Sequence, residues 1–189
     1  MHVAKKGLRV LGIAESFRGR DRSVLAGVVM RRDRVIDGVE IGEVTVGGMD
    51  ATAAVIALFF DFEREDVNLI MLSGCIIAWY NIIDPAAVHA ATGVPVVVVT
   101  YEDSEGLEEE IAAHFPGDEE RAAAYRRLGG RLPLHLSNGY TAYIRPAGID
   151  DDTAGKLVDA FTLEGRVPEP LRVARLAARA VMRYTCRPR

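Results

Sequence analysis

The stretch NLIMLSGCIIAWYNIIDPAAVHAATGVPVVVVT, residues 68–100, contains two short apolar runs with a helical signal between them. The runs at 68–72 and 95–100 are continuous rather than alternating, which is typical of parallel strands that are buried on both faces. Between them, Asp84 is a helix N-cap and Pro85 occupies the first helical position. A strand, a helix and a strand in this order predict a parallel pair joined by a crossover helix.

Three further apolar runs precede this stretch, at residues 8–14, 24–31 and 34–46. The third alternates loosely between apolar and polar residues, and a turn at Arg32-Asp33 separates it from the second. These runs therefore predict three strands, with the last two antiparallel. Asp50 then reads as the N-cap of an apolar helix that extends to Phe62.

The remainder of the chain predicts mainly helices. A helical pattern follows the acidic stretch 102–110, a last strand spans 140–145, and two helices follow at 151–164 and 169–184. The chain has 189 residues, 49% of them hydrophobic, and contains no repeat and no linker. We therefore expect residues 1–189 to form a single α/β domain with a mixed sheet and helices on both faces.

Several classes of protein are excluded by composition and by cysteine spacing. The only cysteines, Cys75 and Cys186, are far apart, which argues against a disulfide framework and against a structural zinc site. The longest apolar run, residues 51–60, is shorter than the roughly 20 residues that a membrane span needs. The apolar run after the N-terminal lysines is too short for a secretion signal. We expect a cytoplasmic protein with no membrane partner, and no pattern assigns an oligomeric state.

The stretch RVLGIAESF, residues 9–17, resembles the first strand of the endonuclease V group of ribonuclease-H-like proteins. The other segments that resemble this group, in chain order, are residues 70–74, 87–95, 143–146, 168–172 and 175–177. Together they span most of the chain, and the resemblance implies a ribonuclease-H-like fold in which an antiparallel meander is followed by parallel strands.

The whole chain is identified more closely as a member of an archaeal family, domain of unknown function 99, also called uncharacterised protein family 0215. This family is related to endonuclease V. The pieces that carry the match are residues 10–13, 36–38, 45–46, 49–52 and 70–72, Asn81, Asp84 and the closing helix. Their order and spacing make the match specific, and it implies a fold rather than a reaction.

The resemblance also implies where catalytic acids would stand. Endonuclease V cleaves a phosphodiester with divalent metal that carboxylates hold at the ends of strands. In this chain Ala14 and Ser73 occupy two of the acidic positions, Glu15 is adjacent to the first, and Asp50 is the nearest match to the third. We therefore do not expect the usual two-metal mechanism, and we assign no metal ligand and no cofactor.

The polar residues that remain are candidates for a site at the strand ends, where open α/β sheets bind ligands. Glu15 and Asp50 are the candidate catalytic residues. A solvated strand end explains Glu15 equally well, and a helix N-cap is the favoured explanation of Asp50. Four further residues are candidates for binding in the cleft: Ser73, Gly74, Asn81 and Asp150.

Aromatic residues follow the strand that ends near Ser73. Packing of Trp79 and Tyr80 against the edge of the sheet is the favoured interpretation, and stacking on a base is the alternative.

The terminal helix carries arginines at every third or fourth position: Arg172, Arg175, Arg179, Arg183 and Arg187. This spacing predicts one cationic stripe opposite an apolar side. A phosphate backbone is one natural partner for such a stripe. The alternative is a solvated face on which the helix dipole favours arginine.

The favoured interpretation is an endonuclease V-related protein that lacks the standard nuclease site and binds nucleic acid through its cleft and its arginines. One alternative is an active nuclease with relocated ligands, Glu15, Asp50 and one of residues 150–152, which would require Mg²⁺ or Mn²⁺. The other is a protein or small-ligand interaction module that uses the Ser73-Gly74 cleft.

Overall fold

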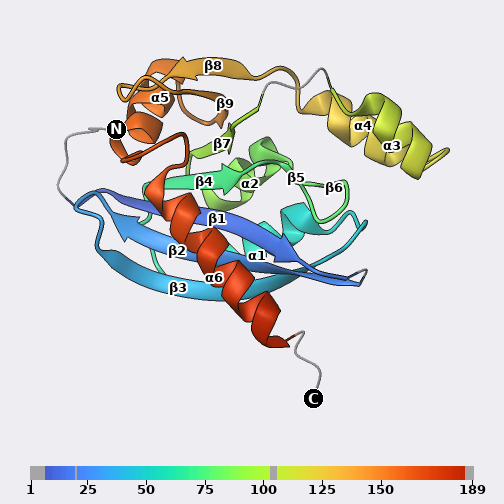
Figure 1. Ribbon diagram of the computed structural model, residues 1–189, viewed down its shortest axis with the longest axis horizontal. Coiled ribbons are helices and arrows are strands. Elements are labelled where there is room, and N and C mark those ends of the chain that lie inside the picture. The colour runs from blue at the N-terminus through green and yellow to red at the C-terminus, as the bar shows by residue number, and fades with distance from the viewer. Residues whose placement is uncertain (1–6, 20, 103–105, 186–189) are drawn as a thin grey trace.

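The computed structural model describes residues 7–19, 21–102 and 106–185 (Figure 1). Within these residues seven strands form one mixed sheet in the order β3-β2-β1-β4-β7-β9-β8, and helices cover both of its faces. The predicted mixed sheet of a meander followed by parallel strands is therefore confirmed.

The meander consists of β1 (Arg9–Phe17), β2 (Arg22–Arg31) and β3 (Ile36–Thr45), and both of its pairings are antiparallel. β1 continues three residues beyond the predicted end at Ala14, because the backbone from Glu15 to Phe17 still pairs with β2. The polar residues there reflect the exposure of the hairpin rather than the end of the strand.

The parallel part of the sheet follows from the stretch that opens the sequence analysis. β4 (Leu69–Ser73) pairs in parallel with β1 and with β7 (Val96–Thr100), and α2 (Pro85–Thr92) connects β4 to β7. The Asp84 side chain accepts hydrogen bonds from the backbone N–H groups of Ala86 and Ala87, at 3.0 and 3.1 Å, so its predicted capping role is confirmed.

Three short strands were not predicted. β8 (Leu132–His135) lies at the edge of the sheet beside β9 (Thr141–Ala147), and it contains Pro133, which an edge strand tolerates. β5 (Ile76–Ile77) and β6 (Asn81–Ile82) form a separate hairpin of two residues on each side. Segments of two to four residues are too short to display a periodic pattern.

Helices pack on the two faces of the sheet (Figure 1). Successive side chains along each strand point to opposite faces, so they contact different layers of helices. α1 (Ala51–Asp61) and α2 lie on one face, while α5 (Asp151–Ala160) and α6 (Glu169–Thr185) lie on the other. α3 (Glu108–His114) and α4 (Glu119–Arg127) pack together at the upper right of Figure 1.

No helix in the described part of the chain is both long enough and apolar enough to span a bilayer.

The position of α6 depends on a glycine in β1. A Cβ atom added at Gly12 would lie 2.5 Å from the carbonyl carbon of Pro170, near the start of α6. The helix therefore approaches the strand more closely than any side chain at position 12 would permit. From this point α6 crosses β1 and β2 (Figure 1).

We expect Gly12→Ala to lower the free energy of unfolding by about 1–3 kcal/mol, because the backbone of α6 must move to admit the methyl group. Gly42→Ala is the matched control: it also lies in a strand, but its added Cβ would lie 3.5 Å from Leu58, an ordinary contact. Urea denaturation of both variants measures the difference. Equal losses of stability in the two variants would contradict the close approach at Gly12.

Candidate functional site

The carboxyl ends of the parallel strands β1, β4 and β7 meet at one edge of the sheet. Ser73 and Thr100 are the last residues of β4 and β7, and Gly74 follows β4 with a positive φ of 85°. Glycine adopts this conformation without steric cost, which allows the chain to turn sharply away from the sheet. This edge is where open α/β sheets bind their ligands.

A hollow of about 300 Å³ lies at this edge between β4 and β7. It shares lining residues with three neighbouring hollows, and we call the four together the carboxyl-edge groove. The groove is lined by residues 73–76, 99–102, 106–107, 129–131, 139–141 and 164–167, with Tyr125, Tyr143, Arg145, Arg172, Arg175, Leu176 and Arg179.

The charge of the groove is opposite to that of the chain. Its lining contains six arginines and two glutamates, whereas the chain as a whole has a formal charge of −4. Four tyrosines are interspersed: Tyr101, Tyr125, Tyr140 and Tyr143. Concentrated positive charge with interleaved aromatic rings can bind a polyanion that also has flat apolar surfaces.

Arg175 connects α6 to the floor of the groove. Its guanidinium donates a hydrogen bond to the Ser73 hydroxyl at 2.8 Å and lies 5.6 Å from the centre of the Tyr101 ring. Burial raises the pKa of the Tyr101 phenol against the opposing effect of Arg175, so the ring beside the cation stays neutral at neutral pH. The cation is therefore fixed at the end of β4 rather than extended into solvent.

The other arginines of the predicted stripe differ in position. Arg172 lines the groove and donates to the backbone carbonyl of Glu164 at 3.0 Å, and Arg179 lines it as an exposed side chain. Arg183 is exposed on α6 but does not line the groove. Arg187 lies outside the described residues.

Three arginines of the groove, Arg131, Arg145 and Arg166, were missed by the sequence analysis. Arg145 of β9 donates to the Cys75 sulfur at 2.9 Å and to the backbone carbonyl of Gly129 at 2.7 Å. Arg131 donates to the backbone carbonyl of Glu102 at 2.9 Å. None of the three belongs to a periodic pattern, so the sequence carries no signal that singles them out.

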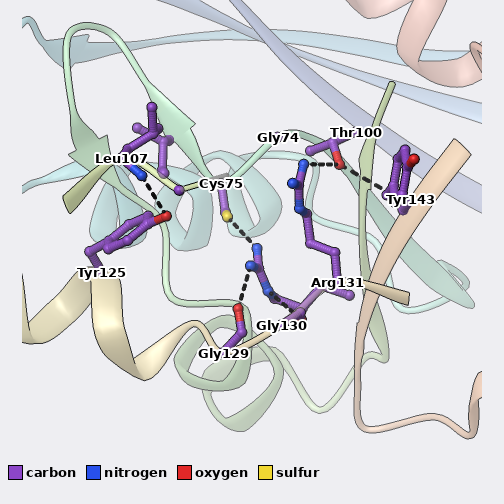
Figure 2. Close-up of a pocket in the computed structure, with 12 residues that line it drawn as sticks. Gly74, Cys75, Thr100, Leu107, Tyr125, Gly129, Gly130, Arg131 and Tyr143 are labelled. Carbon is purple, nitrogen blue, oxygen red and sulfur yellow. Dashed lines mark hydrogen bonds between the residues drawn. The ribbon is translucent and has the colours of Figure 1, made fainter. Parts of the chain in front are cut away.

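Cys75 lies in the same part of the groove, which has a volume of about 490 Å³ (Figure 2). Burial raises the pKa of its thiol, although Arg145 opposes this effect. The thiol is therefore protonated at neutral pH and is a packing group rather than a nucleophile.

Glu15 and Ser73 lie on opposite faces of the sheet. The Glu15 carboxylate accepts hydrogen bonds from the Ser23 hydroxyl at 2.6 Å and from the backbone N–H of Ala78 at 3.4 Å. Its neighbour Ala14 is buried on the other face against Ala174 of α6. Successive side chains of a strand point to opposite faces of the sheet. The Glu15 carboxylate therefore lies on the face opposite to the one on which Arg175 binds Ser73.

The predicted capping role of the Asp50 side chain is wrong, although Asp50 stands at the N-cap position of α1. Its carboxylate instead accepts hydrogen bonds from the Thr45 hydroxyl at 2.7 Å and from the Asn81 amide at 2.6 Å. Burial alone would raise the pKa of Asp50, but these hydrogen bonds outweigh it and lower the pKa below its ordinary value.

Asn81 is fully buried and takes over part of the capping. Its side-chain oxygen accepts from the backbone N–H of Ala51 at 3.0 Å, and its nitrogen donates to the carbonyl of Thr45 at 2.8 Å as well as to Asp50. Thr45, Asp50, Ala51 and Asn81 therefore hold the turn between β3 and α1.

Asp150 is not brought to the carboxyl-edge groove. It follows β9, whose end at Ala147 pairs with the first residue of β7, so it lies at the opposite edge of the sheet. Its side chain accepts from the backbone N–H of Thr153 at 2.8 Å and caps α5, and these hydrogen bonds lower its pKa.

The structure therefore separates Asp150 from Glu15, the first acid of the relocated-ligand alternative. No group of three or more His, Cys, Asp or Glu side chains within residues 7–19, 21–102 and 106–185 could hold a metal ion. Divalent magnesium or manganese needs several oxygen ligands around one point, so this donor set does not fit such an ion.

We expect Asn81→Ala to lower the free energy of unfolding by about 2–3 kcal/mol, because it leaves the buried or half-buried partners of three hydrogen bonds unsatisfied. Asn138→Ala serves as the control, since Asn138 lies in an exposed turn and its loss should cost less than about 1 kcal/mol. Thermal denaturation of both variants measures the two losses. A loss for Asn81→Ala no larger than for the control would contradict its role in the turn.

Comparison with known proteins places this geometry in a family. A family model described as Endonuclease dU matches residues 6–182. The UPF0215 protein of Pyrobaculum calidifontis is 44% identical over 179 residues, which cover 94% of this chain and 98% of that protein. A UPF0215 protein of Thermococcus kodakarensis is 34% identical and covers 94% of each chain.

Solved structures share the fold. A protein of unknown function from Archaeoglobus fulgidus is similar with a TM-score of 0.78 and 29% identity, covering 93% of this chain and 98% of that one. Endonuclease V of Ciona intestinalis, in complex with DNA that contains an inosine, has a TM-score of 0.64 at 15% identity and covers 95% and 88% of the two chains. The fold is thus that of the ribonuclease-H-like endonuclease V proteins, and the chain belongs to the Endonuclease dU family, together with the archaeal UPF0215 proteins.

Proposed function

We propose that this protein binds a single strand, or an unpaired segment, of nucleic acid in the carboxyl-edge groove. The observation that carries the proposal is Arg175, a cation fixed between Ser73 and Tyr101 at the centre of that groove. A phosphate group at this place would meet a guanidinium whose position is already set, so little side-chain entropy is lost on binding.

The rest of the lining supports a strand rather than a single small anion. Arginines lie on both sides of Arg175. Arg131 lies toward α4, Arg166 lies toward α5, and Arg179 lies further along α6. The tyrosines between them supply ring faces on which bases of any sequence can stack. The separate hollows, of about 300–540 Å³ each, are suited to single nucleotides rather than to a duplex.

The shared fold is a further support. Endonuclease V of Ciona intestinalis has been solved in complex with DNA, and its fold covers 95% of this chain. A groove at the ends of the same parallel strands is therefore a reasonable place for a nucleic acid in this protein.

The test compares Arg175→Ala with Arg34→Gln by fluorescence anisotropy on a labelled single-stranded DNA of 20 nucleotides at several salt concentrations. Arg34 is exposed in the turn between β2 and β3, beside the amino-terminal end of β1 and so at the end of the sheet opposite the groove. We expect Arg175→Ala to weaken binding about tenfold and to reduce the salt slope by about 0.7, since one phosphate contact is lost. Arg34→Gln should bind like the unaltered protein.

Two results would contradict the proposal. The first is absence of binding by the unaltered protein at low salt. The second is an equal loss of affinity in Arg175→Ala and Arg34→Gln, which would show that only overall charge matters. Melting temperatures of both variants are measured first, so that a loss of folding is not mistaken for a loss of binding.

The family description favours a second function, cleavage of the bound strand at deoxyuridine. Glu15 is the acid at the end of β1 and the candidate for this chemistry, although it lies on the face opposite Ser73. Because the acids of the described residues form no metal-binding group, the test incubates DNA containing one deoxyuridine both without added metal and with Mg²⁺ or Mn²⁺. Cleavage that is lost in Glu15→Gln while binding persists would support it, and absence of cleavage by the unaltered protein would leave binding alone.

A further inference from the structure

A hollow of about 650 Å³ lies outside the carboxyl-edge groove, between the β1–β2 hairpin and α3. It is lined by Phe17, Gly19, Val46, Gly47, Trp79 and Phe115, and we call it the aromatic pocket. None of these lining residues is charged. Trp79 is 48% exposed and Phe17 is 38% exposed, so two large aromatic side chains present uncovered surface there. A ligand that covered both rings would remove apolar area from water.

The backbone that carries Trp79 is strained. Ala78, Trp79 and Tyr80 have successive φ values of +42°, +63° and +59°, in the left-handed region that non-glycine residues seldom adopt. Such a conformation is energetically unfavourable and persists only when its surroundings fix it, which occurs most often at functional sites. A relaxed turn would place the indole elsewhere.

Hydrogen bonds from three directions fix this turn. The backbone N–H of Gly47 donates to the carbonyl of Ala78 at 2.7 Å, and Glu15 accepts from the N–H of Ala78. Arg121, which is only 3% exposed, donates to the carbonyls of Tyr80 and Gly47. The pocket is thus formed before any ligand arrives.

The walls of the pocket are set in the same way. The guanidinium of Arg121 lies 3.9 Å from the centre of the Phe115 ring, which holds that ring in place. Gly47 leaves room, because a Cβ atom there would lie 3.5 Å from Trp79 and 3.6 Å from Phe115. The Trp79 ring also lies 4.9 Å from that of His114. The opening therefore accepts a flat, uncharged group.

We infer that the aromatic pocket receives one unpaired nucleobase of the strand that lies in the carboxyl-edge groove. This inference rests on the proposed function. Trp79 stands at the tip of the β5–β6 hairpin, and Ile76 at the base of the same hairpin lines the groove. A base that leaves the groove here meets an uncharged aromatic pocket, while its phosphates stay beside the arginines.

An apolar side chain of a protein partner is the rival occupant. The carboxyl-edge groove argues against it, since the six arginines that line the groove favour a ligand with regularly spaced negative charge and flat rings.

Trp79 is the only tryptophan in the chain, so its fluorescence reports on the pocket directly. The protein is titrated with oligothymidylate of 12 nucleotides and with a strand of equal length and charge in which every residue is abasic. Binding is followed independently by anisotropy of a label at the distal end of each strand. We expect both strands to bind, and only the strand with bases to quench Trp79.

The outcomes separate the two proposals. Binding of both strands without any change in Trp79 fluorescence would overturn the base site and leave the groove standing. Equal quenching by both strands would also overturn it, because the change would then not arise from a base. Absence of binding by either strand would overturn the proposed function and this inference together.

Variants add a second readout. Phe17→Ala removes one wall of the pocket, and Phe60→Ala, an exposed phenylalanine on α1, is the control. Phe17→Ala should weaken binding of oligothymidylate about tenfold and leave the abasic strand unaffected, whereas Phe60→Ala should change neither. An equal effect of Phe17→Ala on both strands would contradict base stacking.

An apolar dye tests the rival occupant. Oligothymidylate should displace 8-anilinonaphthalene-1-sulfonate from the pocket. Dye that remains bound next to Trp79 at saturating oligothymidylate would favour an apolar protein partner and contradict the inference.

Discussion

The backbone of Pro170 lies against Gly12 of β1, and the placement of the functional surface follows from that contact. Because no side chain intervenes, α6 begins close to the sheet and crosses β1 and β2 within reach of the strand ends (Figure 1). One turn and a half along the helix, Arg175 reaches Ser73. A feature of packing thus sets the position of a cation at the edge where α/β sheets bind ligands.

The two faces of β1 have different roles at that edge. On one face Ala14 packs beneath α6, and the neighbouring groove holds arginines and tyrosines. On the other face Glu15 accepts hydrogen bonds from Ser23 and Ala78, and so supports the strained turn that carries Trp79. The acidic side chains at this edge thus stabilise loops, and the positive charge is concentrated in the groove of a chain whose formal charge is −4. A field of this kind orients a polyanion toward the groove.

The sequence predicted the parts of the fold that local signals determine. The apolar runs of β4 and β7 and the cap at Asp84 each have a clear pattern, whereas β8 and the β5–β6 hairpin are too short for one. At the site, the helical spacing predicted the stripe that contains Arg175, but not Arg131 or Arg145, which follow no period. The Asp50 side chain does not cap α1 because Asn81, 31 residues away, binds it, and such a distant contact leaves no local signal.

The most direct measurement is a crystal structure of the protein with a short single-stranded oligonucleotide. The account predicts a phosphate within hydrogen-bond distance of Arg175, bases against the tyrosines of the carboxyl-edge groove, and a strand that follows the ends of β4 and β7. An oligonucleotide on another face of the molecule, with Arg175 bonded only to Ser73, would contradict it.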